Sequence, residues 1–228
     1  MSYQLFLGYT FEGTTDKSFF KSIIERTISE ILCTYSNKDV EIVLIPFNKD
    51  GENFIDQSIN VIKKGFIDNS TNIFYIHSDA DDSTNRLVVK YKFEPLYKEL
   101  LKISEIKDCK IIPIIPIYMT EAWMLADFDL FKKEISTDKT KAQLNLSGNP
   151  ELFTDPKLRI VEALRITNNE LPKKRRKDLK INDLYQIIGQ KIEIKKLMNL
   201  SSFKEFYFNS FDVLKQLNII DYNKSIEL

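Results

Sequence analysis

Acidic side chains follow the most apolar runs of the chain. Glu12 stands two residues after the end of the run Tyr3–Thr10, and Asp79 and Asp81 stand at the end of the run that begins at Asn72. Carboxylates a few Å apart repel and raise one another's pKa, so a cluster of them is tolerated mainly where a cation lies among them. Oxygen ligands of this kind suit Mg²⁺ or Mn²⁺. The acids therefore predict a metal site, provided that the fold brings them together.

The chain contains few histidines and cysteines, the residues that bind zinc and other transition metals. The chain has one histidine, His77, and two cysteines, Cys33 and Cys109, that stand far apart in the sequence. This argues against a structural zinc site and against a disulfide framework. Asp16 and Asp82 lie close in sequence to the first acids and are secondary ligand candidates. For His77 we expect a packing or supporting role beside the cluster rather than catalysis.

Four apolar runs predict the strands that would position these acids. The second and third runs are almost continuously apolar, as in strands covered on both faces, so we expect both to be central. The fourth run carries two prolines, which favour an edge position. With helical spacing between them, the runs predict a βαβαβαβ order and an α/β, Rossmann-like fold with a mainly parallel sheet flanked by helices. The runs are Tyr3–Thr10, Val40–Pro46, Asn72–Asp79 and Lys110–Met119.

The helices between the runs show regular apolar spacing. Thr14 or Thr15 can cap the first, and Pro95 should restart or kink the third. The first is expected to bury a face made of Phe19, Phe20, Ile23, Ile24, Thr27, Ile28 and Ile31.

The second half of the chain changes character. Residues 136–156 are polar and show no sustained period, which predicts a connecting loop. Asp155 and Pro156 then form a helix start, and the remainder keeps helical spacing without strand alternation. We therefore predict an α/β domain over 1–135, a connecting loop over 136–156, and a C-terminal helical lobe over 157–228.

In a parallel α/β sheet, ligands bind at the carboxyl ends of the strands. Glu12, Asp79 and Asp81 should therefore share one rim of the sheet. Glu121 follows the fourth run and should reach the same rim as an additional ligand.

These residues resemble the TOPRIM domain of topoisomerases, primases and the overcoming-lysogenization-defect nucleases. Its pattern is a Glu-Gly after the first strand and an Asp-x-Asp after a later one, matched here by Glu12-Gly13 and Asp79-Ala80-Asp81. The chain most resembles small stand-alone bacterial TOPRIM proteins of defence loci, which add a Glu-x-Trp-x-Leu-x-Asp segment, here Glu121 to Asp127. Where topoisomerases usually have glycine after the aspartates, this chain has "DDST", so a topoisomerase-like geometry is not implied.

The resemblance implies magnesium- or manganese-dependent cleavage of phosphodiester bonds. Asp79 and Asp81 would hold metal against the scissile phosphate, and Glu12 would complete the metal set or move a proton. Asp127 and His77 are further candidates. The chain would then be a nuclease effector of anti-phage defence, acting on DNA or RNA.

The alternative is a non-catalytic TOPRIM-like subunit that binds a partner, such as an ATPase of a defence complex. The chain has no Gly-x-x-x-x-Gly-Lys loop, so nucleotide-driven switching would need another protein. Glu12 and both aspartates of the pattern are retained, which favours the nuclease. A homodimer is also compatible with the sequence.

Charge gives no global sign of a nucleic-acid binder, because 33 basic and 33 acidic residues leave a formal net charge of +0. A local basic run, Lys173, Lys174, Arg175 and Arg176, is either a solvated turn or a holder of the phosphate backbone. No segment is apolar over the roughly 18 residues needed to span a bilayer, so we expect a cytoplasmic protein without membrane contact.

Overall fold

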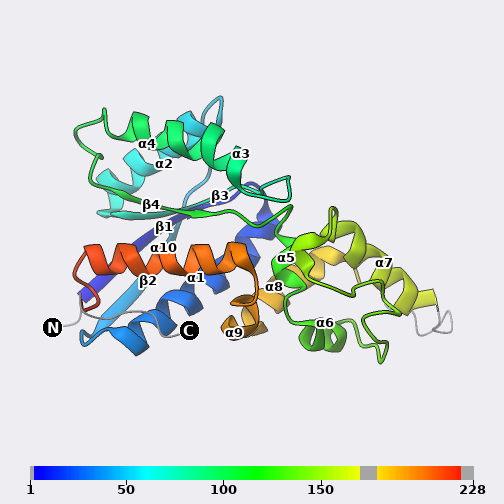
Figure 1. Ribbon diagram of the computed structural model, residues 1–228. Coiled ribbons are helices and arrows are strands. Elements are labelled where there is room, and N and C mark those ends of the chain that lie inside the picture. Colours follow the sequence, from blue (N-terminus) through cyan, green and yellow to red (C-terminus); the bar gives the residue numbers. More distant parts are fainter. Residues whose placement is uncertain (1–2, 170–178, 222–228) are drawn as a thin grey trace.

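The computed structural model describes residues 3–169 and 179–221 (Figure 1). Four strands form one fully parallel sheet in the order β2-β1-β3-β4. This confirms the predicted α/β fold with a parallel sheet. The strands are β1 (Tyr3–Thr10), β2 (Val40–Pro46), β3 (Ile73–His77) and β4 (Lys110–Ile114).

The prediction that Val40–Pro46 is a central strand was wrong. β2 lies at one edge and pairs only with β1, whereas β1 pairs with both β2 and β3. Val40 and Ile42 of β2 pack against the larger hydrophobic core and Ile45 packs against the smaller one. A continuous apolar run therefore indicates that both faces of a strand are covered. It does not indicate whether the strand is central or at an edge of the sheet. β4 lies at the other edge, as its prolines predicted.

Helices cover both faces of the sheet (Figure 1). α1 (Thr14–Tyr35) and α10 (Ser201–Gln216) lie on one face, and α2 (Phe54–Asn69) and α4 (Glu94–Leu100) lie on the other. The predicted apolar face of α1 is confirmed, since all seven of its residues are 0% exposed. This burial fixes the start of α1 at the carboxyl end of β1.

The predicted cap of α1 was wrong. Gly13 is the N-cap and makes no side-chain hydrogen bond, because the helix already begins at Thr14. The carboxyl of Asp16, in the first turn, interacts instead with the backbone N–H of Gly13. The helix start is therefore organised by an acid that belongs to the candidate site.

The third crossover contains a short π-helix. α3 (Arg86–Val88) runs into η1 (Val89–Phe93), and α4 begins at Glu94, one residue before Pro95. Proline has no N–H to continue the α-helical ladder, and a single π turn absorbs the mismatch. The predicted restart at Pro95 is confirmed.

The described residues of the second half form helices joined by turns and loops, with no strand, and they share the core of the sheet. α7 begins at Pro156 as predicted, and Asp155 accepts the N–H of Leu158 at 2.7 Å. α10 packs on β4, and α8 packs on α1. The elements are α5 (Glu121–Met124), α6 (Phe128–Glu134), η2 (Pro150–Leu152), α7 (Pro156–Asn169), α8 (Ile181–Lys191), α9 (Ile194–Leu197) and α10.

Trp123 joins the two halves. It is fully buried, its ring packs on Phe20 of α1 and on Phe203 and Phe206 of α10, and its indole N–H donates to Ser202 at 2.7 Å. Trp123 is thus a core anchor and is not available for stacking on bases. Among the described helices, none has the length and apolar character to cross a bilayer.

Candidate active site

The carboxyl ends of β1, β3 and β4 are adjacent at one edge of the sheet. Thr10 lies beside Ile76, and His77 lies beside Ile114, in the parallel register. The segments that leave these strand ends carry Glu12, Asp79 and Glu121. The strand order therefore brings acids from three separate parts of the chain to the same edge.

Asp79 is the most firmly held of these acids. Its Oδ1 accepts hydrogen bonds from His77 Nε2 at 3.1 Å, from the Thr120 N–H at 2.9 Å and from the Thr120 hydroxyl at 3.3 Å. Within the described part of the chain, no hydrogen bond reaches Oδ2. One oxygen of Asp79 thus fixes the side chain, and the other keeps its acceptor capacity.

His77 supports Asp79 from inside the core. It is 0% exposed and packs against the rings of Phe11 and Phe20, with ring centroids 5.8 and 4.7 Å away. Because the Asp79 carboxylate can only accept, we assign the ring hydrogen to Nε2. Nδ1 is buried and has no partner among the described residues. The geometry thus agrees with the expected supporting role.

Asp16 of α1 belongs to the same cluster. Burial raises the pKa of Asp16, nearby Asp79 raises it further, and His77 opposes the rise. Asp16 was predicted only as a secondary ligand candidate, yet the first turn of α1 places its carboxyl near Asp79 and Thr120.

Asp81 has a strained backbone. Its φ of 51° lies in the left-handed region, as does the φ of 57° at Tyr118. The Asp81 N–H donates to the Tyr118 carbonyl at 3.0 Å, and the Tyr118 N–H donates to the Asp82 carbonyl at 3.1 Å. These two hydrogen bonds connect the loop after β3 to the loop after β4. Strained backbone of this kind is common at functional sites. Burial raises the pKa of Asp81, and Asp79 and Glu12 add to the rise against the effect of Lys92.

Glu12 lies at the more open side of the site. Its Oε1 is 3.9 Å from Nζ of Lys92, and the Glu12 side chain is 45% exposed. Lys92 also donates to the Ser78 hydroxyl at 2.7 Å. Lys92 belongs to η1, so the π turn helps to bring a cation beside the acids.

Glu121 is held from the helical half of the chain. It is 4% exposed, and its Oε1 accepts a hydrogen bond of 2.5 Å from the Tyr185 hydroxyl of α8. Lys157 of α7 lies 4.0 Å from the same oxygen. Burial raises the pKa of Glu121, and the negative charge of Asp79 adds to the rise, while Tyr185 opposes it.

One known protein family matches most of the chain, including the acids of the candidate site. Residues 11–208 match the family model described as a domain of unknown function, DUF4276. The chain belongs to the DUF4276 family. No curated protein and no solved structure matches the chain. The DUF4276 match includes Glu12, both aspartates of the Asp-x-Asp, Glu121 and Tyr185.

Two predicted candidates serve local structure in this DUF4276 chain. Asp82 accepts the N–H of Ser83 at 2.6 Å and the Ser83 hydroxyl at 3.2 Å, which stabilises the turn. Asp127 is the N-cap of α6 and accepts the Leu130 N–H at 3.1 Å. Lys173, Lys174, Arg175 and Arg176 lie outside the described residues.

Some functional candidates of the DUF4276 chain escaped the sequence analysis. Thr120, which donates hydrogen bonds to Asp79, directly precedes Glu121. Its place next to a predicted site residue was the signal that could have identified it. Lys92 lies in an ordinary basic stretch, and only the π turn explains its placement. Tyr185 and Lys157 reach Glu121 across long sequence separations, so their contacts with Glu121 could not be predicted from local spacing.

The donor chemistry fits Mg²⁺ or Mn²⁺, because the site offers carboxylate oxygens on several elements. In the side-chain arrangement described, no three of the His, Cys, Asp and Glu groups in residues 3–169 and 179–221 converge on one point. That the acids share one cation stays a prediction.

Proposed function

We propose that this protein is a magnesium- or manganese-dependent nuclease that cleaves phosphodiester bonds in DNA or RNA. The observation that supports it best is the electrostatic condition of the strand-end acids. The pKa values of Asp16, Asp81 and Glu121 are all raised by burial and by neighbouring carboxylates. Such a cluster costs stability without a cation and is expected where a divalent ion is to be bound.

Asp79, Asp81 and Glu12 are the residues that would hold the metal, and Glu121 is the additional candidate. When bound, the ion would stabilise the negative charge that gathers on the phosphate oxygens during cleavage. Glu12 and Asp81 are the exposed acids of this set, whereas the Asp79 side chain is 23% exposed.

The chain's own residues supply the remaining functions. Thr120 and His77 hold Asp79 in a single orientation through Oδ1. The ammonium of Lys92 lies close enough to Glu12 to attract a phosphate to the site. Glu12 can take the proton of the attacking water, or return one to the leaving oxygen, because its carboxyl is reached by solvent.

The biological setting rests on the resemblance to TOPRIM proteins of defence loci. We propose an effector that acts in the cytoplasm on nucleic acid during phage infection. Two free cysteines, one exposed and one buried, agree with a reducing compartment.

The test is cleavage of plasmid, single-stranded DNA and transfer RNA with Mg²⁺ or Mn²⁺ present or chelated. Wild-type protein should cut at least one of them, and only with metal. Asp79→Asn keeps an oxygen acceptor for Thr120 and His77 but removes the charge, so it should lower the rate at least 100-fold while substrate binding persists. Asp82→Asn is the matched control and should retain activity.

Failure has a defined meaning. If pure wild-type protein cuts none of the substrates, alone or with a co-expressed ATPase partner, the nuclease proposal is wrong and the partner-binding alternative leads. Equal loss of cleavage in Asp82→Asn and Asp79→Asn would contradict the assignment of Asp79 to the metal and of Asp82 to the local turn.

A further inference from the structure

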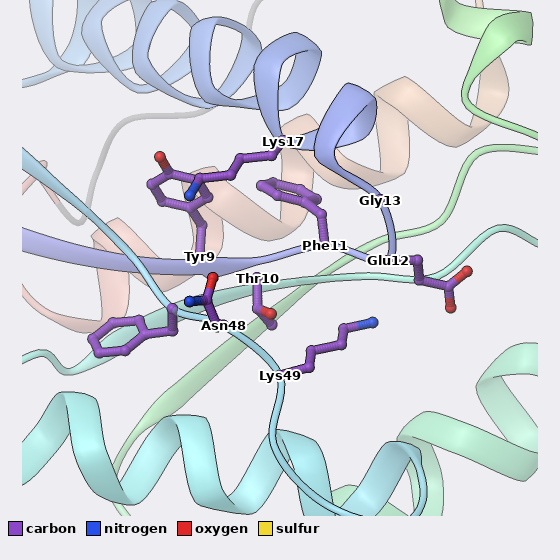
Figure 2. A pocket seen from close by; sticks show the side chains of 9 residues that line it. Tyr9, Thr10, Phe11, Glu12, Gly13, Lys17, Asn48 and Lys49 are labelled. Carbon is purple, nitrogen blue, oxygen red and sulfur yellow. The ribbon is translucent and has the colours of Figure 1, made fainter.

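A pocket lies beside the acids and includes Glu12 in its lining (Figure 2). It has a volume of about 270 Å³ and lies between the carboxyl ends of β1 and β2 and the first turn of α1. Thr10, Asn48, Lys49 and Lys17 contribute its polar lining. None of them has been used above for the acidic cluster.

Thr10 brings a buried hydroxyl to this pocket. Its side chain is 2% exposed, and its Oγ1 has no hydrogen-bond partner among the described residues. A buried hydroxyl without a partner is unfavourable, so such groups usually face a ligand or water. Figure 2 shows the Thr10 side chain beside Asn48 and Lys49 in the pocket.

Lys49 brings a positive charge that lacks an acidic partner. No carboxylate of the described residues lies within 4.0 Å of its Nζ, and its ammonium instead lies 5.9 Å from the ring centre of Phe54. Lys92 approaches the same ring at 5.6 Å. Burial lowers the pKa of Lys49 and the charge of Lys92 lowers it further, whereas the charges of Glu12 and Asp16 oppose the change. A bound anion would stabilise both ammonium groups.

The remaining walls agree with an anion rather than a cation. Lys17 approaches from α1, and Gly13 places the first turn of this 22-residue helix at the wall, where the helix dipole favours negative charge. Glu12 is the one acid in the lining, and Figure 2 shows its carboxyl pointing away from Tyr9 and Thr10.

We infer that this pocket is a phosphate-binding subsite, separate from the acids, which takes a phosphate of the polynucleotide next to the one being cleaved. The Thr10 hydroxyl, the Asn48 amide and the ammonium group of Lys49 are its recognition groups, and Lys17 lies at the other side of β1, beside Tyr9 (Figure 2). The identity of the ligand as a polynucleotide rests on the proposed function, whereas the binding of phosphate does not.

Binding is tested without cleavage, in the presence of chelator so that no divalent ion occupies the acids. Calorimetric titration would use inorganic phosphate, 5′-phosphorylated dithymidine and unphosphorylated dithymidine with its single bridging phosphate. We expect both dinucleotides to bind more tightly than inorganic phosphate. Lys49→Met should raise their Kd at least about tenfold, and Thr10→Val should raise it severalfold.

Thr27→Val is the matched control. Thr27 is a fully buried threonine of α1 whose hydroxyl is also unpartnered among the described residues, and it does not line the pocket. It should leave every Kd unchanged. Asn48→Asp, which keeps side-chain size but adds a negative charge, should abolish binding and serves if Lys49→Met fails to fold.

The outcomes separate the two proposals. Unchanged phosphate and dinucleotide affinity in Thr10→Val, Lys49→Met and Asn48→Asp would overturn the subsite, even if the wild type proves to be a nuclease. Pocket-dependent binding by a protein that cuts nothing would support the subsite and contradict the nuclease. Tighter binding of inorganic phosphate than of either dinucleotide would overturn the assignment to a polynucleotide.

Discussion

The hydroxyl of Tyr185 donates a hydrogen bond of 2.5 Å to Oε1 of Glu121. The bond connects α8 of the helical half to the first residue of α5, which follows the last strand of the sheet. Burial and the negative charge of Glu121 raise the pKa of Tyr185, so the tyrosine stays a hydroxyl donor at neutral pH. The position of a site acid is thus set by a residue 64 positions away.

Tyr185→Phe should lower the free energy of unfolding by about 1.5–3 kcal/mol, because a buried carboxyl loses its hydroxyl donor while the aromatic ring is kept. Denaturant unfolding measures this value. Tyr91→Phe removes a hydroxyl from an exposed ring and should change stability by less than about 0.5 kcal/mol. Equal effects of the two substitutions would contradict the assigned bond.

The raised pKa of Glu121 predicts a pH dependence with a defined sign. The folded state binds a proton at Glu121 more tightly than the unfolded state, so this residue's contribution to stability is greatest below its ordinary pKa of about 4.5 and is lost as pH rises through the higher folded value. Glu121→Gln cannot ionise and keeps an oxygen acceptor for Tyr185. It should be more stable than wild type at pH 7, with the difference shrinking toward pH 4.

Divalent ions should stabilise the folded protein by neutralising the acids. At ten times its Kd, Mg²⁺ or Mn²⁺ should add about 1.4 kcal/mol of stability, or about 3 to 6 °C in melting temperature for a chain of this size. Thermal unfolding with metal and with chelator measures the shift. The shift should vanish in a variant carrying Asp79→Asn and Asp81→Asn and persist in Asp127→Asn, whose carboxyl caps α6.

The basic run Lys173, Lys174, Arg175 and Arg176 gives a prediction from sequence alone. Replacing all four with glutamine should weaken nucleic-acid binding and reduce the salt slope by up to about 3.6, since each lost phosphate contact removes about 0.9 from it. Electrophoretic titration at two salt concentrations measures both effects. Neutralising Lys195 and Lys196 of α9 is the control, and an unchanged slope in the first variant would leave the run as a solvated turn.

Gly189 sets how closely α8 approaches α1. A Cβ at this position would lie 2.7 Å from the backbone oxygen and 3.0 Å from Cα of Phe19. Gly189→Ala should therefore cost about 1–3 kcal/mol, because backbone cannot move aside as a side chain can. Gln190→Ala, at an exposed neighbouring position, should be nearly neutral by denaturant unfolding.

The sequence was most informative where the signal is local and repeated. The apolar face of α1, the four strands and the helix start at Pro156 all follow from periodicity, proline and strand composition. Periodicity cannot reveal strand order, and β2 was misplaced for that reason. The placement of Glu12, Asp79 and Glu121 at one edge of the sheet was predictable because each follows an apolar run. The contacts of Lys92 with Glu12 and of Tyr185 with Glu121 arise from tertiary packing and could not be predicted from spacing.

The helix that completes the sheet comes late in the chain. α10 covers the β4 side of the sheet, and Trp123 packs on Phe203 and Phe206, which a ribosome adds only after the rest of the α/β core. A nascent chain that ends before α8 leaves Glu121 without Tyr185, and one that ends before α10 leaves Trp123 uncovered. Assembly of this edge of the sheet therefore waits until α8 and α10 have left the ribosome, although every strand of the sheet is synthesised before them.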